Sequence, residues 1–337
     1  MSKDSISRRT MLRVVGRVGA SAALGGLAVA ELIRRGRLKR VRRTEARLGT
    51  LVSVEVVHED AAAARQVVGG AFDTIGRLEG ILSRHDRESQ LSRLNREGRL
   101  DAPDAHLLNV LAAAQDLSRQ TAGAFDVTVG PLLQLYERAF VREGREPRSE
   151  EIRMALQRVG YEALVVEGST VLLERPGMAV TVDGIGKGYV VDQVVSQMRR
   201  MGIEDVLVDA GGDLASAGTQ GGGGWPVTIQ RPPGAGGPSP LLHLRGDALA
   251  TSGDYMRAFT SDRTAHHIVD PRTGRSPRDV ASTSVRAGSA MRSDALSTAS
   301  MILGWDEGPA VLQSLEGVEG MVVAKWGETR STTGWSV

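Results

Sequence analysis

The chain of 337 residues contains no cysteine. Disulfide bonds, thiolate metal sites, a cysteine nucleophile and a lipidated N-terminal cysteine are therefore excluded. Long apolar runs are also missing, because the mildly apolar stretch 18–30 is shorter than the roughly 20 residues that a membrane-spanning helix needs. No repeat of fixed period is found. With 41% hydrophobic residues, the chain can bury a sizeable core in one large domain or in two.

Positive charge is scarce outside the N-terminal region. The whole chain carries a net charge of +2, but residues 1–43 hold 12 Lys and Arg against two acidic residues. The remaining residues, 44–337, therefore hold 30 basic and 38 acidic side chains, a net charge of −8. An acidic globular part argues against nucleic acid as a partner.

The basic N-terminal region has the features of a twin-arginine export signal. Arg8 and Arg9 stand in the sequence SRRTMLR, the apolar stretch follows, and Ala28-Val29-Ala30 offers small residues for signal-peptidase cleavage. We predict export by the twin-arginine translocation machinery to the outer face of the cytoplasmic membrane or to the periplasm. The alternative is an uncleaved basic anchor that lies on a membrane surface. The predicted division of the chain is a signal segment at 1–30, a basic linker at 31–44 and one folded domain at 45–337.

The order of the predicted elements indicates an α/β or α+β fold. Alternating apolar residues predict strands at 51–57, 163–167, 171–173 and 206–208, one that begins at Ala248, and a last one at 320–325. Apolar residues at helical spacing predict helices at 60–82, 104–120 and 146–159, a fourth that ends at Gly202 and a fifth that ends at Leu303 and Gly304. The Pro/Gly-rich segment 231–240 is predicted to be a hairpin loop between strands.

The stretch 180–218 is predicted to be the centre of the functional site. Glycines 184, 186 and 188 separate a strand from a helix N-terminus, where unpaired N–H groups and a partial positive charge suit a phosphate. Lys187 lies at this positive end of the helix, which is unfavourable unless an anion joins it. Gly211 and Gly212 end the next strand. Anion binding is therefore slightly favoured over a simple turn.

Three later motifs carry polar side chains that suit nucleotide chemistry. Residues 251–255 (TSGDY) offer hydroxyls for phosphate or ribose, although such triplets also make ordinary turns. His267, in the pair His266-His267, is a candidate catalytic residue, and a structural role is almost as well supported. Asp294, Ser297 and Thr298 share one helix face, and their hard oxygen atoms suit Mg²⁺; taken alone, N-capping of the helix explains this motif better.

The motifs of the chain follow one another in the order 48–50 (LGT), 86–95, 124–126 (AFD), 183–189 (DGIGKGY), 211–213 (GGD), 251–255, 267–271 (HIVDP) and 294–298 (DALST). In this order they resemble the motifs of the FAD:protein FMN transferases, the ApbE family. The resemblance covers roughly residues 45–330.

The resemblance implies a single catalytic domain of two interlocked lobes, with mixed, largely antiparallel sheets and surrounding helices. It implies an enzyme that binds FAD and Mg²⁺ and transfers FMN to a Thr or Ser hydroxyl of an acceptor flavoprotein, with release of AMP. Two alternatives stay open: an FAD pyrophosphatase that gives FMN and AMP, and an exported FAD-binding module without chemistry.

The resemblance also implies the roles of particular residues. His267 and Asp254 are expected to assist proton removal from the acceptor hydroxyl. The metal ligands are expected to be Gly184 through its carbonyl, Asp294, Ser297 and Thr298. The expected FAD contacts are Leu48, His85, Ala124, Phe125, Asp126, Thr181, Lys187, Thr251, Ser252, Gly253 and Ile268.

This chain departs from the family pattern at three places. Leu48 stands where Met is frequent, and His85 stands where an aromatic residue is frequent. Thr181 stands where Asp is common, and Asp183 replaces the first residue of a glycine pair. An Asp beside a pyrophosphate is repulsive unless it faces Mg²⁺.

Overall fold

A computed structural model describes residues 38–336, and its centre is an eight-stranded sheet. The strand order is β1-β2-β6-β7-β10-β11-β12-β13, and each neighbouring pair is antiparallel. This agrees with the largely antiparallel sheets that the family resemblance implied. The strands are β1 (Lys39–Arg47), β2 (Thr50–His58), β6 (Asp205–Ala210), β7 (Asp213–Ala217), β10 (Ala248–Gly253), β11 (Val280–Ala287), β12 (Glu319–Ala324) and β13 (Thr329–Ser331).

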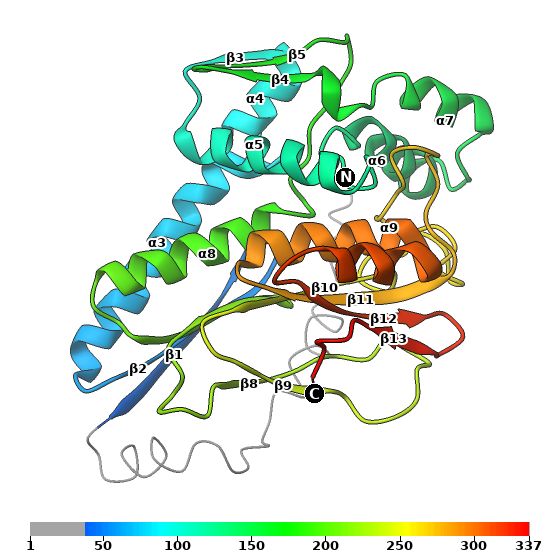
Figure 1. Ribbon diagram of the computed structural model, residues 1–337. Coiled ribbons are helices and arrows are strands. Elements are labelled where there is room, and N and C mark those ends of the chain that lie inside the picture. The colour runs from blue at the N-terminus through cyan, green and yellow to red at the C-terminus, as the bar shows by residue number, and fades with distance from the viewer. Residues whose placement is uncertain (1–37, 337) are drawn as a thin grey trace.

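Three helices pack on one face of this sheet: α3 (Ala61–Leu82), α8 (Gly186–Arg200) and α9 (Ala290–Ser314). Asp60 caps α3 by accepting hydrogen bonds from the N–H groups of Ala62 and Ala63. The apolar faces of α3 and α8 pack with the inward-facing residues of β2 and β6, such as Val54 and Val208, in the main core. In Figure 1, α8 and α9 lie between the sheet and the upper part of the molecule.

The upper part of Figure 1 contains the other helices and a small sheet. Its elements are α4 (Gln90–Glu97), α5 (Ala105–Gln120), α6 (Gly130–Tyr136), a π-helical segment (Glu137–Arg142), α7 (Ser149–Leu156), a 3₁₀ turn (Tyr161–Ala163) and strands β3 (Arg99–Asp101), β5 (Thr170–Leu173) and β4 (Leu164–Glu167). The core of this part is continuous with the main core, since Leu107 and Val171 belong to the same apolar cluster as Val54. The two parts therefore form one folded unit.

A hairpin of β8 (Trp225–Thr228) and β9 (Leu241–Leu244) packs against outer residues of the large sheet. Trp225 and Leu244 join Leu249 of β10 and Met321 of β12 in a separate apolar cluster. The segment 231–240 is the loop of this hairpin, as the sequence predicted.

The structure differs from the sequence prediction at both ends of the domain. From Lys39 onward, the predicted linker 31–44 belongs to β1, which pairs with β2 along its whole length. The sequence did not predict this strand, because many of the side chains of β1 are basic and exposed. The last predicted helix breaks at Gly304, which has φ 83°, but a second helical segment continues to Ser314. The predicted signal segment 1–30 lies outside the described residues. In residues 38–336, no helix has the length and apolarity to cross a membrane.

Candidate active site

The site is built where the N-terminal parts of α8 and α9 meet. Gly188 makes this approach possible, because a Cβ at this position would lie 2.3 Å from the carbonyl oxygen of Ala290. Asp192 of α8 then accepts hydrogen bonds from the N–H groups of Ala290 (2.8 Å) and Met291 (2.9 Å). A carboxylate of one helix thus caps the other helix, which fixes the two N-termini relative to each other.

Oxygen atoms from three elements converge at this junction. Ser252 Oγ of β10 lies 2.7 Å from Ser297 Oγ and 3.1 Å from Thr298 Oγ1 of α9. The Gly184 loop packs against the same place, because a Cβ on Gly184 would lie 3.1 Å from Thr298 Oγ1. Asp294 lies one helical turn before Thr298, and its Oδ2 accepts a hydrogen bond from the Gly188 N–H at 3.2 Å. Five of the predicted metal and FAD residues therefore meet in space.

The charges at the junction are strongly coupled. Lys187 forms an ion pair with Asp213 and lies 4.0 Å from Asp294 Oδ2. Burial lowers the pKa of Lys187, but the two carboxylates outweigh burial and raise it, so this side chain is charged. Burial, together with the charge of Asp213, raises the pKa of Asp294 to about 7. The anion that Lys187 was predicted to need at the helix N-terminus is thus supplied in part by this chain itself.

The donor set fits a hard divalent cation. Three hydroxyls and one buried carboxylate offer oxygen atoms, which are the ligands that Mg²⁺ takes. Burial, and then the charge of Asp213, disfavours the ionised form of Asp294, and a bound cation would stabilise that form. Among residues 38–336, no three His, Cys, Asp or Glu side chains cluster.

His267 lies on the segment 254–277, which follows β10. Its N–H donates to the Arg257 carbonyl at 3.0 Å, while the ring atom Nδ1 is buried and has no hydrogen-bond partner in the described part of the chain. Burial lowers the pKa of His267 to about 4, so the ring is neutral at pH 7. Asp183 and Lys187 are near enough that their charges act on this pKa in opposite directions.

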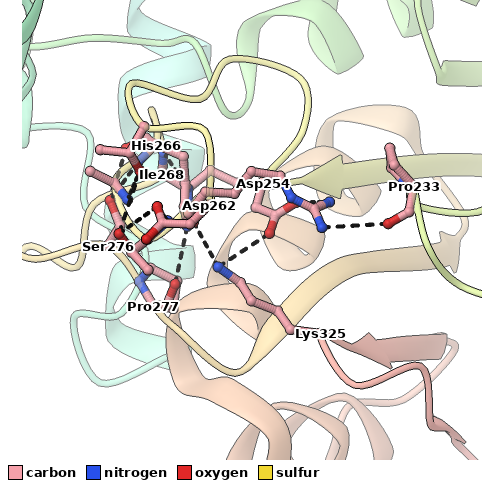
Figure 2. A network of polar contacts seen from close by, with 12 residues as sticks. Pro233, Asp254, Asp262, His266, Ile268, Ser276, Pro277 and Lys325 are labelled. Carbon is pink, nitrogen blue, oxygen red and sulfur yellow. Dashed lines mark hydrogen bonds and ion pairs between the residues drawn. The ribbon is translucent and has the colours of Figure 1, made fainter.

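The neighbouring His266 has a structural environment. Its Nε2 donates to the Pro277 carbonyl at 3.1 Å, and its Nδ1 accepts from the Ile268 N–H at 3.3 Å. Burial lowers its pKa to about 4. The backbone N–H of His266 also bonds to Ser276 Oγ. Figure 2 shows this cluster, which ties together the two ends of the turn that follows His267.

Asp254 lies in a buried ion-pair network that Figure 2 also shows. It is 0% exposed, its Oδ1 lies 3.2 Å from Arg263 and its Oδ2 lies 3.2 Å from Lys325. Lys325, which follows β12, also donates to the Arg263 carbonyl at 2.7 Å. Asp254, predicted to assist proton removal, is therefore engaged with two cations that hold the segment carrying His267.

The other predicted FAD contacts lie around this centre in different environments. His85 is exposed after α3, and half-buried Leu48 lies in the β1–β2 turn with φ 53°. Ala124 and Ile268 belong to one apolar cluster, and Phe125 lies 3.5 Å from the place of a Cβ on Gly184. Asp126 accepts from the Thr128 N–H and hydroxyl and from the Tyr161 N–H, so its carboxylate shapes the loop.

Three predicted contacts are engaged within the protein itself. Thr181 Oγ1 accepts from the Asp183 N–H at 3.2 Å. Thr251 Oγ1 lies 2.8 Å from Ser284 Oγ on β11, and Gly253 lies against the ring of Tyr255. These residues therefore shape the backbone near the site.

The sequence prediction missed three residues that organise the site. Asp192 is a half-buried acidic residue that directly follows the buried Val190 and Val191 of α8, and that pattern was the available signal. Asp213 lay in a motif that was noticed, but its ion pair with Lys187 is a contact across 26 residues. Arg84 pairs with Asp183 across 99 residues, and no local pattern indicates such a contact.

The fold and the site define a class: an α+β protein with an oxygen-lined, charge-coupled site at the joined N-termini of two helices. Comparison with known proteins gives the family. The pattern of the ApbE family matches residues 48–322, and the chain belongs to this family.

Named relatives and solved structures agree with this assignment. The chain is 32% identical to the FAD:protein FMN transferase of Vibrio cholerae, over 79% of this chain and 82% of that protein. It is 29% identical to the FAD:protein FMN transferase of Treponema pallidum, over 89% of each chain. The apo crystal structure of the Pseudomonas stutzeri flavinyl transferase ApbE superimposes with a TM-score of 0.78 and 28% identity, covering 89% of this chain and 98% of that one.

Proposed function

We propose that this protein is an FAD:protein FMN transferase that moves FMN from FAD to a Thr or Ser hydroxyl of an acceptor flavoprotein and releases AMP. Membership of the ApbE family supports the reaction class. The observation that carries the proposal is the convergence of Asp294, Ser297, Thr298 and Ser252 beside the Gly184 loop. Transfer of a phosphoryl-linked group depends mainly on positioning and on neutralising charge, which such an oxygen-lined site is suited to organise.

We assign Mg²⁺ to Asp294, Ser297, Thr298 and the carbonyl of Gly184. A bound Mg²⁺ supplies positive charge for the pyrophosphate oxygens of FAD. The Asp192 clamp and the close packing at Gly188 hold the Gly184 loop, which leads into α8, next to the ligands on α9. Lys187, held by Asp213, adds a fixed cation at the same edge.

His267 is assigned as the general base. The acceptor oxygen forms a bond to the FMN-side phosphorus, the bond from that phosphorus to the bridging oxygen breaks, and the bridging oxygen leaves with AMP. The proton of the acceptor hydroxyl passes to the unpartnered Nδ1 of His267. Asp254 is assigned to hold the His267 segment, because it is fully buried between Arg263 and Lys325.

The remaining assignments concern the two ends of FAD. Ala124, Phe125 and Asp126 form the loop assigned to the adenine and ribose end, with Ile268 packed beside Ala124. Leu48 and His85 are assigned to the flavin ring. The rest of the assigned FAD contacts lie between these ends: Thr181, Lys187, Thr251, Ser252 and Gly253.

The test is to incubate purified protein with FAD, Mg²⁺ and an acceptor carrying a Thr among small residues. An FMN-sized mass gain on the acceptor, together with AMP, supports the proposal. AMP and FMN without that gain would identify an FAD pyrophosphatase, and bound FAD without either product would identify a binding module; both outcomes contradict transfer. Asp294→Ala should remove the chemistry and leave the protein folded.

Export through the twin-arginine machinery is also part of the proposal, as is the division into a leader (1–30), a basic linker (31–44) and the transferase domain (45–337). Arg8 and Arg9 with the following apolar stretch support it. In a bacterial host, Arg8→Lys together with Arg9→Lys should keep the protein in the cytoplasm. Unchanged fractionation of this variant would contradict the route, and the N-terminal residue of the exported protein tells cleavage from anchoring.

A further inference from the structure

An ion-pair network borders the site on the side of the Gly184 loop. Arg84, just after α3, donates from Nε to Asp183 Oδ2 at 2.7 Å and from a terminal nitrogen to Glu137 Oε1 at 2.9 Å. Arg257 donates to the same Glu137 oxygen at 3.0 Å. Two guanidinium groups thus balance two carboxylates. Arg84 is the most shielded of the four, with a side chain that is 14% exposed, whereas that of Asp183 is 43% exposed.

Asp183 lies at a sensitive place for an acidic residue. It directly precedes Gly184, whose backbone packs against Thr298. If the proposed function is correct, the FAD pyrophosphate binds beside this loop, and a free carboxylate there would repel it.

We infer that Arg84 is a positioning residue that neutralises Asp183 and holds its carboxylate aside, so that FAD can bind next to an acidic loop. The inference rests on the proposed function. A direct contact between Arg84 and FAD is not required, because two of its nitrogens are already engaged with Asp183 and Glu137. The role of Arg84 therefore exists only because Asp183 is acidic.

This dependence makes the inference testable with a double-mutant cycle. FAD affinity is measured by flavin fluorescence with Mg²⁺ and without acceptor, for wild type, Arg84→Gln, Asp183→Asn and the double variant. We expect Arg84→Gln to weaken FAD binding about tenfold, which corresponds to about 1.4 kcal/mol. Asp183→Asn should bind FAD at least as well as wild type. The double variant should match Asp183→Asn, because no carboxylate is left to neutralise.

Arg99→Gln is the matched control. It removes one positive charge from an exposed ion pair with Asp101 on β3, in a different sheet, and should leave FAD affinity unchanged. The defect of Arg84→Gln should also shrink at high ionic strength, because salt screens the exposed Asp183. Thermal unfolding midpoints of all variants should lie close to that of wild type, which separates binding from folding.

The outcomes separate this inference from the function on which it rests. A double variant as weak as Arg84→Gln would overturn the inference, since Arg84 would then act on FAD or on the fold without Asp183. If wild-type protein transfers FMN, but the effects of Arg84→Gln and Asp183→Asn on FAD affinity simply add in the double variant, the inference is refuted and the proposed function stands. Wild-type protein that binds FAD and shows the expected rescue, but transfers no FMN, would refute the proposed transferase and leave the role of Arg84 standing.

Discussion

Substitution of Lys325 by Met tests whether the buried ion pairs hold the segment that carries His267. Lys325 reaches into the fold with a side chain that is 17% exposed and makes two contacts there. It lies 3.2 Å from Asp254 Oδ2 and donates to the Arg263 carbonyl at 2.7 Å. Oδ2 of Asp254 has no hydrogen-bond partner in the described residues, so Lys325 supplies its main compensation. Methionine keeps the length of the side chain and removes the charge.

The expected loss of unfolding free energy is about 3 kcal/mol at pH 7. Removing one partner of a buried ion pair typically costs about 3–5 kcal/mol, because the other charge is left without compensation. The lower end applies here, since Arg263 still pairs with Asp254 at 3.2 Å. Part of this cost reflects the lost bond to the Arg263 carbonyl, which is typically worth about 1.5–3 kcal/mol for a charged donor.

The loss should depend on pH with a definite sign. Burial raises the pKa of Asp254 above its usual value, with Lys325 and then Arg263 opposing that rise. Removing Lys325 raises this pKa further. A carboxyl group whose folded pKa is raised stabilises the fold most below its unfolded pKa and less as pH rises through the folded pKa. The gap between wild type and Lys325→Met should therefore be largest near pH 7 and shrink as pH falls through the raised pKa of Asp254, where this group takes up a proton.

Urea unfolding followed by tryptophan fluorescence at several pH values measures this gap. Lys325→Arg, which keeps a cation, is the control and should lose much less stability. A Lys325→Met variant as stable as wild type at pH 7, or a gap that does not change with pH, would show that the network does not hold the segment. In that case Asp254 would return to consideration as a group that acts on the acceptor hydroxyl.

Three further predictions concern the site itself. His267→Gln should bind FAD normally and slow FMN transfer by a factor on the order of 10²–10⁴. Because the pKa of His267 is about 4, ionisation of this residue should cause no fall in the transfer rate of the wild-type protein between pH 7 and pH 6. Gly188→Ala should cost about 1–3 kcal/mol of unfolding free energy and weaken Mg²⁺ binding, because the new Cβ would clash with the Ala290 carbonyl. The control is Gly80→Ala on α3, where a Cβ has open space, and this variant should not be destabilised. Mg²⁺ affinity, measured by calorimetry, should fall as pH drops below about 7 and be lost in Asp294→Asn, because a proton on Asp294 competes with the cation.

Much of the fold and the site could be predicted from local pattern. The apolar periodicity of α3 and its Asp60 cap, the glycines before α8, and the oxygen triplet of α9 are properties of short stretches, and the structure brings Gly184, Ser252 and Thr298 together. β1 could not be found in this way, because exposed arginines along an edge strand break the alternation that marks a strand.

Local sequence pattern also could not predict the ion pairs between segments that are far apart in the sequence. The contact of Arg84 with Asp183 spans 99 residues, and that of Lys325 with Asp254 spans 71 positions of the printed sequence. Neither side chain has a neighbour in sequence that would single it out. Such contacts follow from the packing of whole elements, so they become visible only after the fold is known.

The lysine at the start of α8 shows how the structure changes the meaning of a sequence signal. A cation at a helix N-terminus predicts a bound anion, and in the structure Lys187 lies next to two carboxylates, those of Asp213 and Asp294. With both carboxylates ionised, these three side chains carry a net charge of −1, which would repel a pyrophosphate. Burial raises the pKa of Asp294 to about 7, so a proton on this group near neutral pH would remove that negative charge. Under the proposed function, a divalent cation that displaces this proton would change the net charge to +1, which would suit a pyrophosphate.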